Sequence, residues 1–222
     1  MTDFAHLHVH SYFSLLDGAV SPRELARRAS ELGMTSIAVT DHNTLGGAVR
    51  FYQAAQSVGI KPIAGVEFTV ELTGDKPLPP LQPPGYNGVA RPTDSRPDTT
   101  TDYTRYAHLV LLAQDNEGYA NLCRLVTCAH LGKAQHSGPF SKEFAHLDRK
   151  KPVLLQEHLR AYAGHLICLS GCEKGEIPRR LAAGQWQEAQ EAADYYHQVF
   201  GADCFYVELQ NNLLPAPQRG LR

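Results

Sequence analysis

Residues 4–10 read FAHLHVH, a run in which small or apolar side chains alternate with rings. Such alternation is typical of a β-strand, because successive side chains point to opposite faces. The pattern places His8 and His10 on the same face, roughly 6–7 Å apart along the backbone, where both imidazoles can converge on one or two metal ions. His6 shares this face one step further back, and we expect it to be structural.

Strand and helix patterns alternate along the rest of the chain. Ser21 and Glu24 form a capping pair around Pro22, which predicts a helix that starts there and stops at Gly33. Further strands are predicted at 35–40, 63–72, 107–113, 165–170 and 204–209, and further helices at about 45–58, 117–130 and 177–200, the last interrupted near Gly184. Six strands alternating with helices indicate a parallel α/β architecture.

A barrel and an open doubly wound sheet both fit this alternation. The barrel is favoured because ionisable residues follow several different strands, and active sites of such barrels gather at the C-terminal ends of many strands. An open sheet would concentrate its ligands near one switch point.

Two stretches interrupt the alternation of strands and helices. Residues 73–105 hold seven of the chain's 14 prolines and predict a Pro/Thr-rich loop insertion, and residues 132–164 predict a loop with a short helix.

The composition excludes several classes of protein. A chain of 222 residues with 43% hydrophobic residues can bury a full core, and a net charge of -2 argues against a stand-alone DNA-coating protein. Five cysteines without a CxxC pair indicate free thiols in a reducing compartment. The chain shows no signal-peptide pattern and no apolar run near the roughly 18 residues that span a bilayer. We therefore expect a cytoplasmic protein without a membrane partner.

Other ionisable residues follow the predicted strands. Asp17 supplies a carboxylate just after the first strand, although Asp-Gly is also an ordinary turn signal. Asp41 and His42 end the next strand and could form a capping or hydrogen-bonded pair; we favour His42 as a metal ligand and Asp41 as the residue that orients it. Glu67 stands in the third strand, where a buried carboxylate must be paired or metal-bound.

Several longer segments resemble one family. They are HLHVHSYFSLLDG, AVTDHNTLGGAVRFYQAA and GIKPIAGVEF, followed by HLVLLAQDNEGYANLCRLVTCAH and LICLSGCEKGEIPRRLAAG. Together they are similar to the N-terminal PHP (polymerase and histidinol phosphatase) domain of the bacterial DNA polymerase III alpha subunit, somewhat closer to the error-prone alpha-type branch. The resemblance covers nearly the whole chain apart from residues 73–105 and about 133–160.

The resemblance implies a PHP-type distorted (β/α)7 barrel with up to three divalent metal ions. The ligands that it implies are His8, His10, Asp17, His42, Glu67, His108 and Cys172. Two of them do not follow from the strand argument, since His108 stands near the start of its strand and Cys172 would otherwise read as a buried thiol. The family completes its site with an Asp-x-His motif on a final strand, and no such motif follows Glu208. We therefore expect a barrel that is incomplete at its C-terminus.

The predicted function is metal-dependent hydrolysis of phosphate esters. Clustered divalent ions lower the pKa of a bound water, and mixed nitrogen and oxygen ligands suit Zn, Mn or Fe. The resemblance implies 3′–5′ exonuclease or pyrophosphatase activity in DNA replication or repair synthesis. It also implies DNA as a partner through the parent polymerase, together with a proofreading exonuclease subunit and other replisome subunits.

Two alternatives remain open at this point. One is a non-catalytic domain that braces the polymerase or docks a proofreading exonuclease. The other is a stand-alone PHP phosphatase, against which the polymerase-like segments YANLCRL and SGCEKGEIPRRL speak. A further open question concerns Arg179 and Arg180, which either contact phosphate or lie on a solvated helix face; the second is the expected reading.

Overall fold

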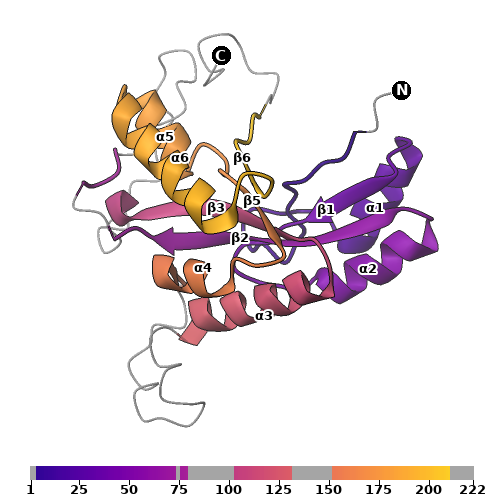
Figure 1. Ribbon diagram of the computed structural model, residues 1–222. Coiled ribbons are helices and arrows are strands. Elements are labelled where there is room, and N and C mark those ends of the chain that lie inside the picture. Colours follow the sequence, from indigo (N-terminus) through magenta and orange to yellow (C-terminus); the bar gives the residue numbers. More distant parts are fainter. Residues whose placement is uncertain (1–3, 74–75, 80–102, 132–151, 211–222) are drawn as a thin grey trace, which may run out of the picture.

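A six-stranded sheet organises the residues that the computed structural model describes, which are 4–73, 76–79, 103–131 and 152–210 (Figure 1). The strands follow the order β1-β2-β3-β5-β6, and β4 pairs with β2 off this path. Their bounds are β1 (Ser36–Val39), β2 (Lys61–Glu71), β3 (Tyr106–Ala113), β4 (Leu154–Leu155), β5 (Leu166–Leu169) and β6 (Phe205–Tyr206). The predicted α/β class is confirmed.

The direction of β3 corrects the prediction of an all-parallel sheet. The pairs β1–β2, β2–β4 and β5–β6 are parallel, whereas β3 runs antiparallel to both β2 and β5. A parallel neighbour needs a crossover connection, which is usually a helix. The described residues between β2 and β3 form only a short 3-10 turn, Tyr103–Arg105, so they supply no such helix. Hydrophobic periodicity carries no information about strand direction, which is why the sequence did not reveal the reversal.

The helices start and stop largely where the sequence predicts. In α1 (Pro22–Glu31) the Ser21 side chain accepts a hydrogen bond from the Glu24 amide, and Gly33 after the helix has φ +75°. The other helices are α2 (Ala48–Ser57), α3 (Asn116–Leu131), α4 (Gln156–Tyr162), α5 (Glu176–Ala182) and α6 (Trp186–Phe200). Most of the predicted insertion at 73–105 lies outside the described residues, and so does the part of the predicted loop at 132–164 that covers 132–151. None of the described helices is both long and apolar enough to cross a membrane.

The FAHLHVH segment runs beside β1 but does not form a regular strand, so the predicted strand at 4–10 is wrong. The Ala38 amide donates to the His6 carbonyl (2.9 Å) and the Thr40 amide to the Val9 carbonyl (2.8 Å). Between these bonds, the Val9 amide donates to the Thr40 hydroxyl (2.9 Å) rather than to a backbone carbonyl. A side chain thus replaces one step of the ladder, while the segment still lies in line with the sheet.

The sheet buries apolar side chains on both faces, which explains the continuous apolar run of β3. Leu109 and Leu111 belong to the main core, which includes residues of α3 and α6. Val110 and Leu112 pack on the opposite face with Ala38 of β1 and Leu169 of β5. The main core contains Val66, Phe68 and Val70 of β2. Because side chains alternate along a strand, Glu67 points to the other face. That second face carries the candidate site.

Candidate metal centre

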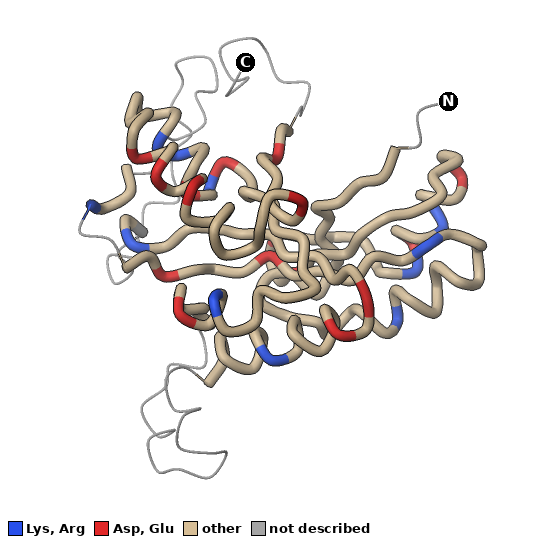
Figure 2. Tube along the Cα trace, viewed as in Figure 1, with Lys and Arg blue, Asp and Glu red and all other residues tan. Residues whose placement is uncertain are grey.

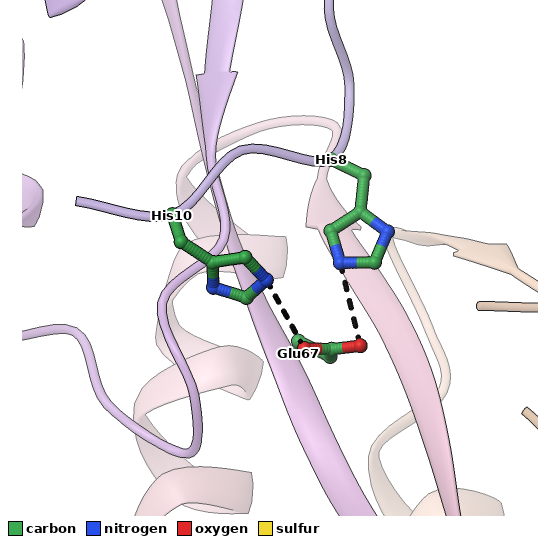
Figure 3. Close-up of side chains that lie close together, drawn as sticks. All are labelled: His8, His10 and Glu67. Carbon is green, nitrogen blue, oxygen red and sulfur yellow. Dashed lines mark ion pairs between the residues drawn. The ribbon is translucent and has the colours of Figure 1, made fainter. Parts of the chain in front are cut away.

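Glu67 is the centre of a cluster of histidines. Its side chain is 1% exposed, and four imidazole nitrogens lie around its two carboxylate oxygens. The distances are 3.3 Å from Oε1 to His8 Nε2, 3.0 Å from Oε1 to His108 Nδ1, 3.2 Å from Oε2 to His10 Nε2 and 2.9 Å from Oε2 to His42 Nδ1. Figure 3 shows the rings of His8 and His10 pointing toward this carboxylate from the same stretch of chain. The structure therefore brings together residues separated by up to 100 positions in the sequence.

The antiparallel strand β3 explains why His108 reaches the cluster. Glu67 lies within β2, and Thr69, two residues further on, pairs directly with His108. Since β3 runs backward relative to β2, the start of β3 lies beside the end of β2. A histidine near the start of an antiparallel strand therefore meets residues from the later part of its neighbour.

His42 is held between β1 and β2. It follows β1, forms an isolated bridge with Glu67, and its Nε2 lies 2.9 Å from Asp17 Oδ2. The turn that presents Asp17 requires glycine at the next position, because a Cβ atom at Gly18 would lie 1.8 Å from the Ser11 carbonyl oxygen. The Asp-Gly pair therefore forms the turn and also supplies a carboxylate to the cluster.

Cys172 enters the cluster from the segment after β5. Its Sγ lies 3.4 Å from Glu67 Oε1 and 4.0 Å from His108 Nδ1. Burial raises the pKa of this thiol to about 12, and the negative charge of Glu67 adds to the effect. Because metals bind thiolate rather than thiol, a cation next to Cys172 would have to displace that proton.

Charge-assisted hydrogen bonds dominate the electrostatics of the cluster. Burial alone would raise the pKa of Glu67, but its bonds to the four histidines outweigh this effect and hold the pKa well below its usual range. Burial lowers the pKa of His8, yet the bonds to Glu208 and Glu67 outweigh it and raise the pKa to about 9. The pKa of His42 is also raised, since bonds to Glu67 and Asp17 overcome its burial, and the bond to His42 lowers the pKa of Asp17.

Three overlapping groups of side chains have the geometry of a metal site. They are His8, His10 and Glu67; His10, Asp17 and His42; and His42, Glu67 and His108, with the ligand atoms of each group within 4.8 Å of one another. The groups share members, so together they form one continuous cluster. Imidazole nitrogens with carboxylate oxygens suit transition metals and zinc better than calcium.

Residues around the ligands include some that sequence reasoning missed. Glu208 Oε1 lies 2.8 Å from His8 Nδ1, and Ser14 Oγ lies 2.9 Å from His10 Nδ1. Asp41, expected to orient His42, instead bonds Ser11 and Ser14, and it is Ser14 that accepts a bond from the His42 amide. Glu208 could have been found, because it lies near the end of the predicted strand at 204–209. Ser14 carried no comparable signal.

Arg179 and Arg180 do not lie on a solvated helix face, so that expectation is wrong. They are 5% and 6% exposed. Arg179 donates to the Tyr106 carbonyl oxygen (2.9 Å), and Arg180 pairs with Glu176 (3.0 Å). Both guanidinium groups thus stabilise the packing of α5. Elsewhere, Figure 2 shows basic and acidic positions interspersed along the described chain.

Comparison with known proteins agrees with this geometry. A family model described as the PHP domain matches residues 6–212, which is most of the chain. This chain belongs to the PHP domain family. The resemblance predicted from the sequence segments is thereby confirmed, and the six-stranded α/β sheet with its histidine-rich face is the form that the PHP domain takes here.

Relatives of this PHP chain include bacterial polymerases. The error-prone DNA polymerase of Symbiobacterium thermophilum is 40% identical over 218 residues, covering 97% of this chain and 17% of that protein. The DNA polymerase III subunit alpha of Treponema pallidum is 35% identical over 211 residues, covering 94% of this chain and 15% of that protein. The chain thus spans about a sixth of the length of these relatives. A solved amidohydrolase from Chromobacterium violaceum is a remote match, with a TM-score of 0.43, 15% identity and coverage of 98% of this chain and 90% of that one.

Proposed function

We propose that this PHP domain hydrolyses phosphate esters with a multinuclear metal centre. The proposed ligands are His8, His10, Asp17, His42, Glu67, His108 and Cys172. The observation that carries the proposal is the arrangement around Glu67, where one buried carboxylate faces four imidazole nitrogens at 2.9–3.3 Å. No other described carboxylate has a comparable set of partners.

The charge balance of this arrangement favours a bound cation. Without metal, each short nitrogen–oxygen contact requires a proton on the imidazole nitrogen. His8 and His42 also bond a second carboxylate through their other ring nitrogen, so both would have to be cationic. Burying charged groups costs several kcal/mol per ion in proteins. Divalent ions that replace the protons would bind the same nitrogens in their neutral form. The cluster is therefore better matched to metal ions than to protons.

The carboxylate of Glu67 would contribute to holding more than one ion. Its Oε1 faces His8 and His108, and its Oε2 faces His10 and His42. Asp17 extends the second group through its contact with His42. When bound, such ions lower the pKa of a coordinated water and offset negative charge on phosphoryl oxygens. The part of this chain is to hold the ligands in place and to orient the imidazoles.

The finer identity of the function rests on the relatives. We propose Zn, Mn or Fe as the metals, up to three of them, and a nucleic-acid 3′ end or pyrophosphate as the substrate. The relatives named above are polymerases several times longer than this chain. We therefore also propose that this chain is part of a polymerase in the cytoplasm, with DNA, a proofreading exonuclease and other replisome subunits as partners. Within it, we propose that residues 1–222 form one PHP domain that carries an insertion at about 73–105.

Metal loading combined with hydrolysis assays tests the proposal. The purified chain and its full-length parent polymerase are loaded with Zn, Mn or Fe, and bound metal is counted by elemental analysis. Hydrolysis of 3′-labelled DNA, pyrophosphate and simple phosphate esters is then measured for the wild type, His8→Ala and Glu67→Ala. Arg27→Ala, on the exposed face of α1, is the control.

Each outcome has a distinct meaning. Stoichiometric metal and metal-dependent hydrolysis, both lost in His8→Ala and Glu67→Ala and kept in Arg27→Ala, support the proposal. A loaded full-length protein that hydrolyses none of the substrates overturns the catalytic part and favours the non-catalytic docking domain. Failure of the wild type to retain any of the three metals overturns the metal centre itself.

A further inference from the structure

We propose that Ser14 is a positioning residue that fixes the tautomer of His10. Ser14 donates its proton to the buried Asp41 carboxylate and therefore accepts a bond from His10 Nδ1. The lone pair of His10 Nε2 then points toward Glu67. The consequence for metal binding rests on the proposed metal centre. The tautomer itself does not, because it follows from hydrogen bonds within the chain.

Ser14 lies at the junction of three hydrogen bonds. Its side chain is buried, at 1% exposure, and its Oγ donates to Asp41 Oδ1 at 2.8 Å. The backbone amide of His42 donates to the same Oγ at 3.0 Å. The third partner is His10 Nδ1, at 2.9 Å.

Counting protons fixes the direction of the third bond. A serine hydroxyl has one proton to donate and two lone pairs with which to accept. Asp41 Oδ1 also accepts the Ser11 amide at 2.7 Å, so it is an acceptor, and the proton of Ser14 is used on it. The His42 amide can only donate. Ser14 therefore has only a lone pair left for His10, and the proton of that bond must sit on His10 Nδ1.

A proton on Nδ1 leaves Nε2 of neutral His10 as an acceptor. This Nε2 lies 3.2 Å from Glu67 Oε2, which is an acceptor too. Two facing lone pairs repel, so the contact is satisfied only when a proton or a cation lies near both atoms. Histidines that bind metal ions usually donate their other ring N–H to a carboxylate or carbonyl oxygen. Here a serine stands between the histidine and the carboxylate.

The same serine also sets the spacing of two candidate ligands. It contacts the ring of His10 and the backbone of His42, whose rings stack with centroids 4.4 Å apart. Asp41, 2% exposed, is itself fixed by the amide and hydroxyl of Ser11, both at 2.7 Å. The buried network therefore holds Ser14 rigidly in relation to both histidines.

Ser14→Ala and Ser11→Ala form a matched pair of variants. Each removes one buried hydroxyl that donates to Asp41, but only Ser14 contacts an imidazole. A role in packing or in satisfying Asp41 predicts similar behaviour of the two variants. A role in positioning His10 predicts that they differ.

The tautomer is read by two-bond nitrogen–proton NMR of metal-free, ¹⁵N-histidine-labelled protein at mildly alkaline pH, with His10→Gln assigning the signal. We expect the Nδ1–H form in the wild type and in Ser11→Ala, and a shift toward the Nε2–H form in Ser14→Ala. Affinity for Zn²⁺, measured by competition with a chelator, and the Co²⁺ absorption spectrum give a second readout. Ser14→Ala is expected to bind Zn²⁺ roughly 10–100-fold more weakly than Ser11→Ala.

The outcomes separate this inference from the proposed function. An Nε2–H tautomer in the wild type overturns the positioning role even if Ser14→Ala fails to fold, and so does an unchanged tautomer in Ser14→Ala. Equal Zn²⁺ affinity of the two variants overturns the effect on metal binding. A wild type that binds no metal but shows the Nδ1–H form would overturn the proposed metal centre and would still support the positioning role of Ser14.

Discussion

His8 Nδ1 lies 2.8 Å from Glu208 Oε1, although 200 residues separate the two positions. The contact joins the segment beside β1 to the segment after β6, which are the two margins of the described sheet. Because a carboxylate accepts the bond, Nδ1 of His8 carries the proton and its Nε2 is directed at Glu67. One ion pair thus links the margins of the sheet and orients a candidate ligand.

Replacement of Glu208 by Gln tests this link. The variant keeps the size of the side chain but removes the charge that holds His8, so we expect Zn²⁺ affinity to fall roughly 10–100-fold. Competition with a chelator measures the change. Glu157→Gln, an exposed glutamate in α4, is the control and should bind like the wild type. Equal affinities of Glu208→Gln and Glu157→Gln would remove any orienting role of Glu208.

Replacement of Glu67 by Gln should have the largest effect of any single change in the cluster. Metal retention should be lost, because two of the three groups of candidate ligands contain this carboxylate. Removing one partner of a buried ion pair typically costs about 3–5 kcal/mol, so the metal-free variant should also unfold at lower denaturant concentration. Elemental analysis and urea titration measure the two effects. Glu71→Gln, at the end of the same strand, is the control; among the described residues Glu71 pairs with the exposed Arg105 and not with the cluster, so metal content should stay unchanged.

The sequence pointed to most of the proposed ligands but not to the way in which they meet. His8 and His10 followed from alternation alone, and Asp17, His42 and Glu67 from their positions near predicted strands. The prediction of a parallel sheet failed at β3, because period-two burial is the same in both strand directions. His108 could therefore be named only through the resemblance. Its place became physically clear once the register of β2 and β3 showed Thr69 opposite His108.

Contacts made by side chains across the fold were beyond the reach of the sequence. Ser14 stands in a turn where serine is ordinary, and only the folded chain brings it to both Asp41 and His10. Arg179 and Arg180 illustrate the same limit in the other direction. A charged pair on a short helix usually faces solvent, whereas here carbonyl oxygens and Glu176 satisfy both side chains in a buried setting.

The stability of the metal-free protein should fall as pH rises from neutral to alkaline. The pKa of His8 is raised from 6.5 to about 9 in the folded state, so its ion pairs contribute fully below about 6.5 and are lost as pH approaches 9. The loss is on the order of 3 kcal/mol across this window. Urea unfolding at several pH values measures it, and His8→Gln should show a flatter profile. Saturating Zn²⁺ should abolish the fall, because metal ions bind the deprotonated ring; a metal-free profile that rises over this range would contradict the assignment.

Gly18→Ala should damage the site through the turn that presents Asp17. An added Cβ would lie 1.8 Å from the Ser11 carbonyl oxygen, a backbone atom that cannot move without shifting the chain that carries His10. We expect destabilisation of about 1–3 kcal/mol, typical of overpacking, together with weaker metal binding. Gly164→Ala is the matched control, since a Cβ there meets nothing within 4 Å. Thermal unfolding with and without Zn²⁺ distinguishes the two effects. If Zn²⁺ stabilises the variant as much as the wild type, the turn matters for folding alone. Asp17 would then no longer be a proposed ligand.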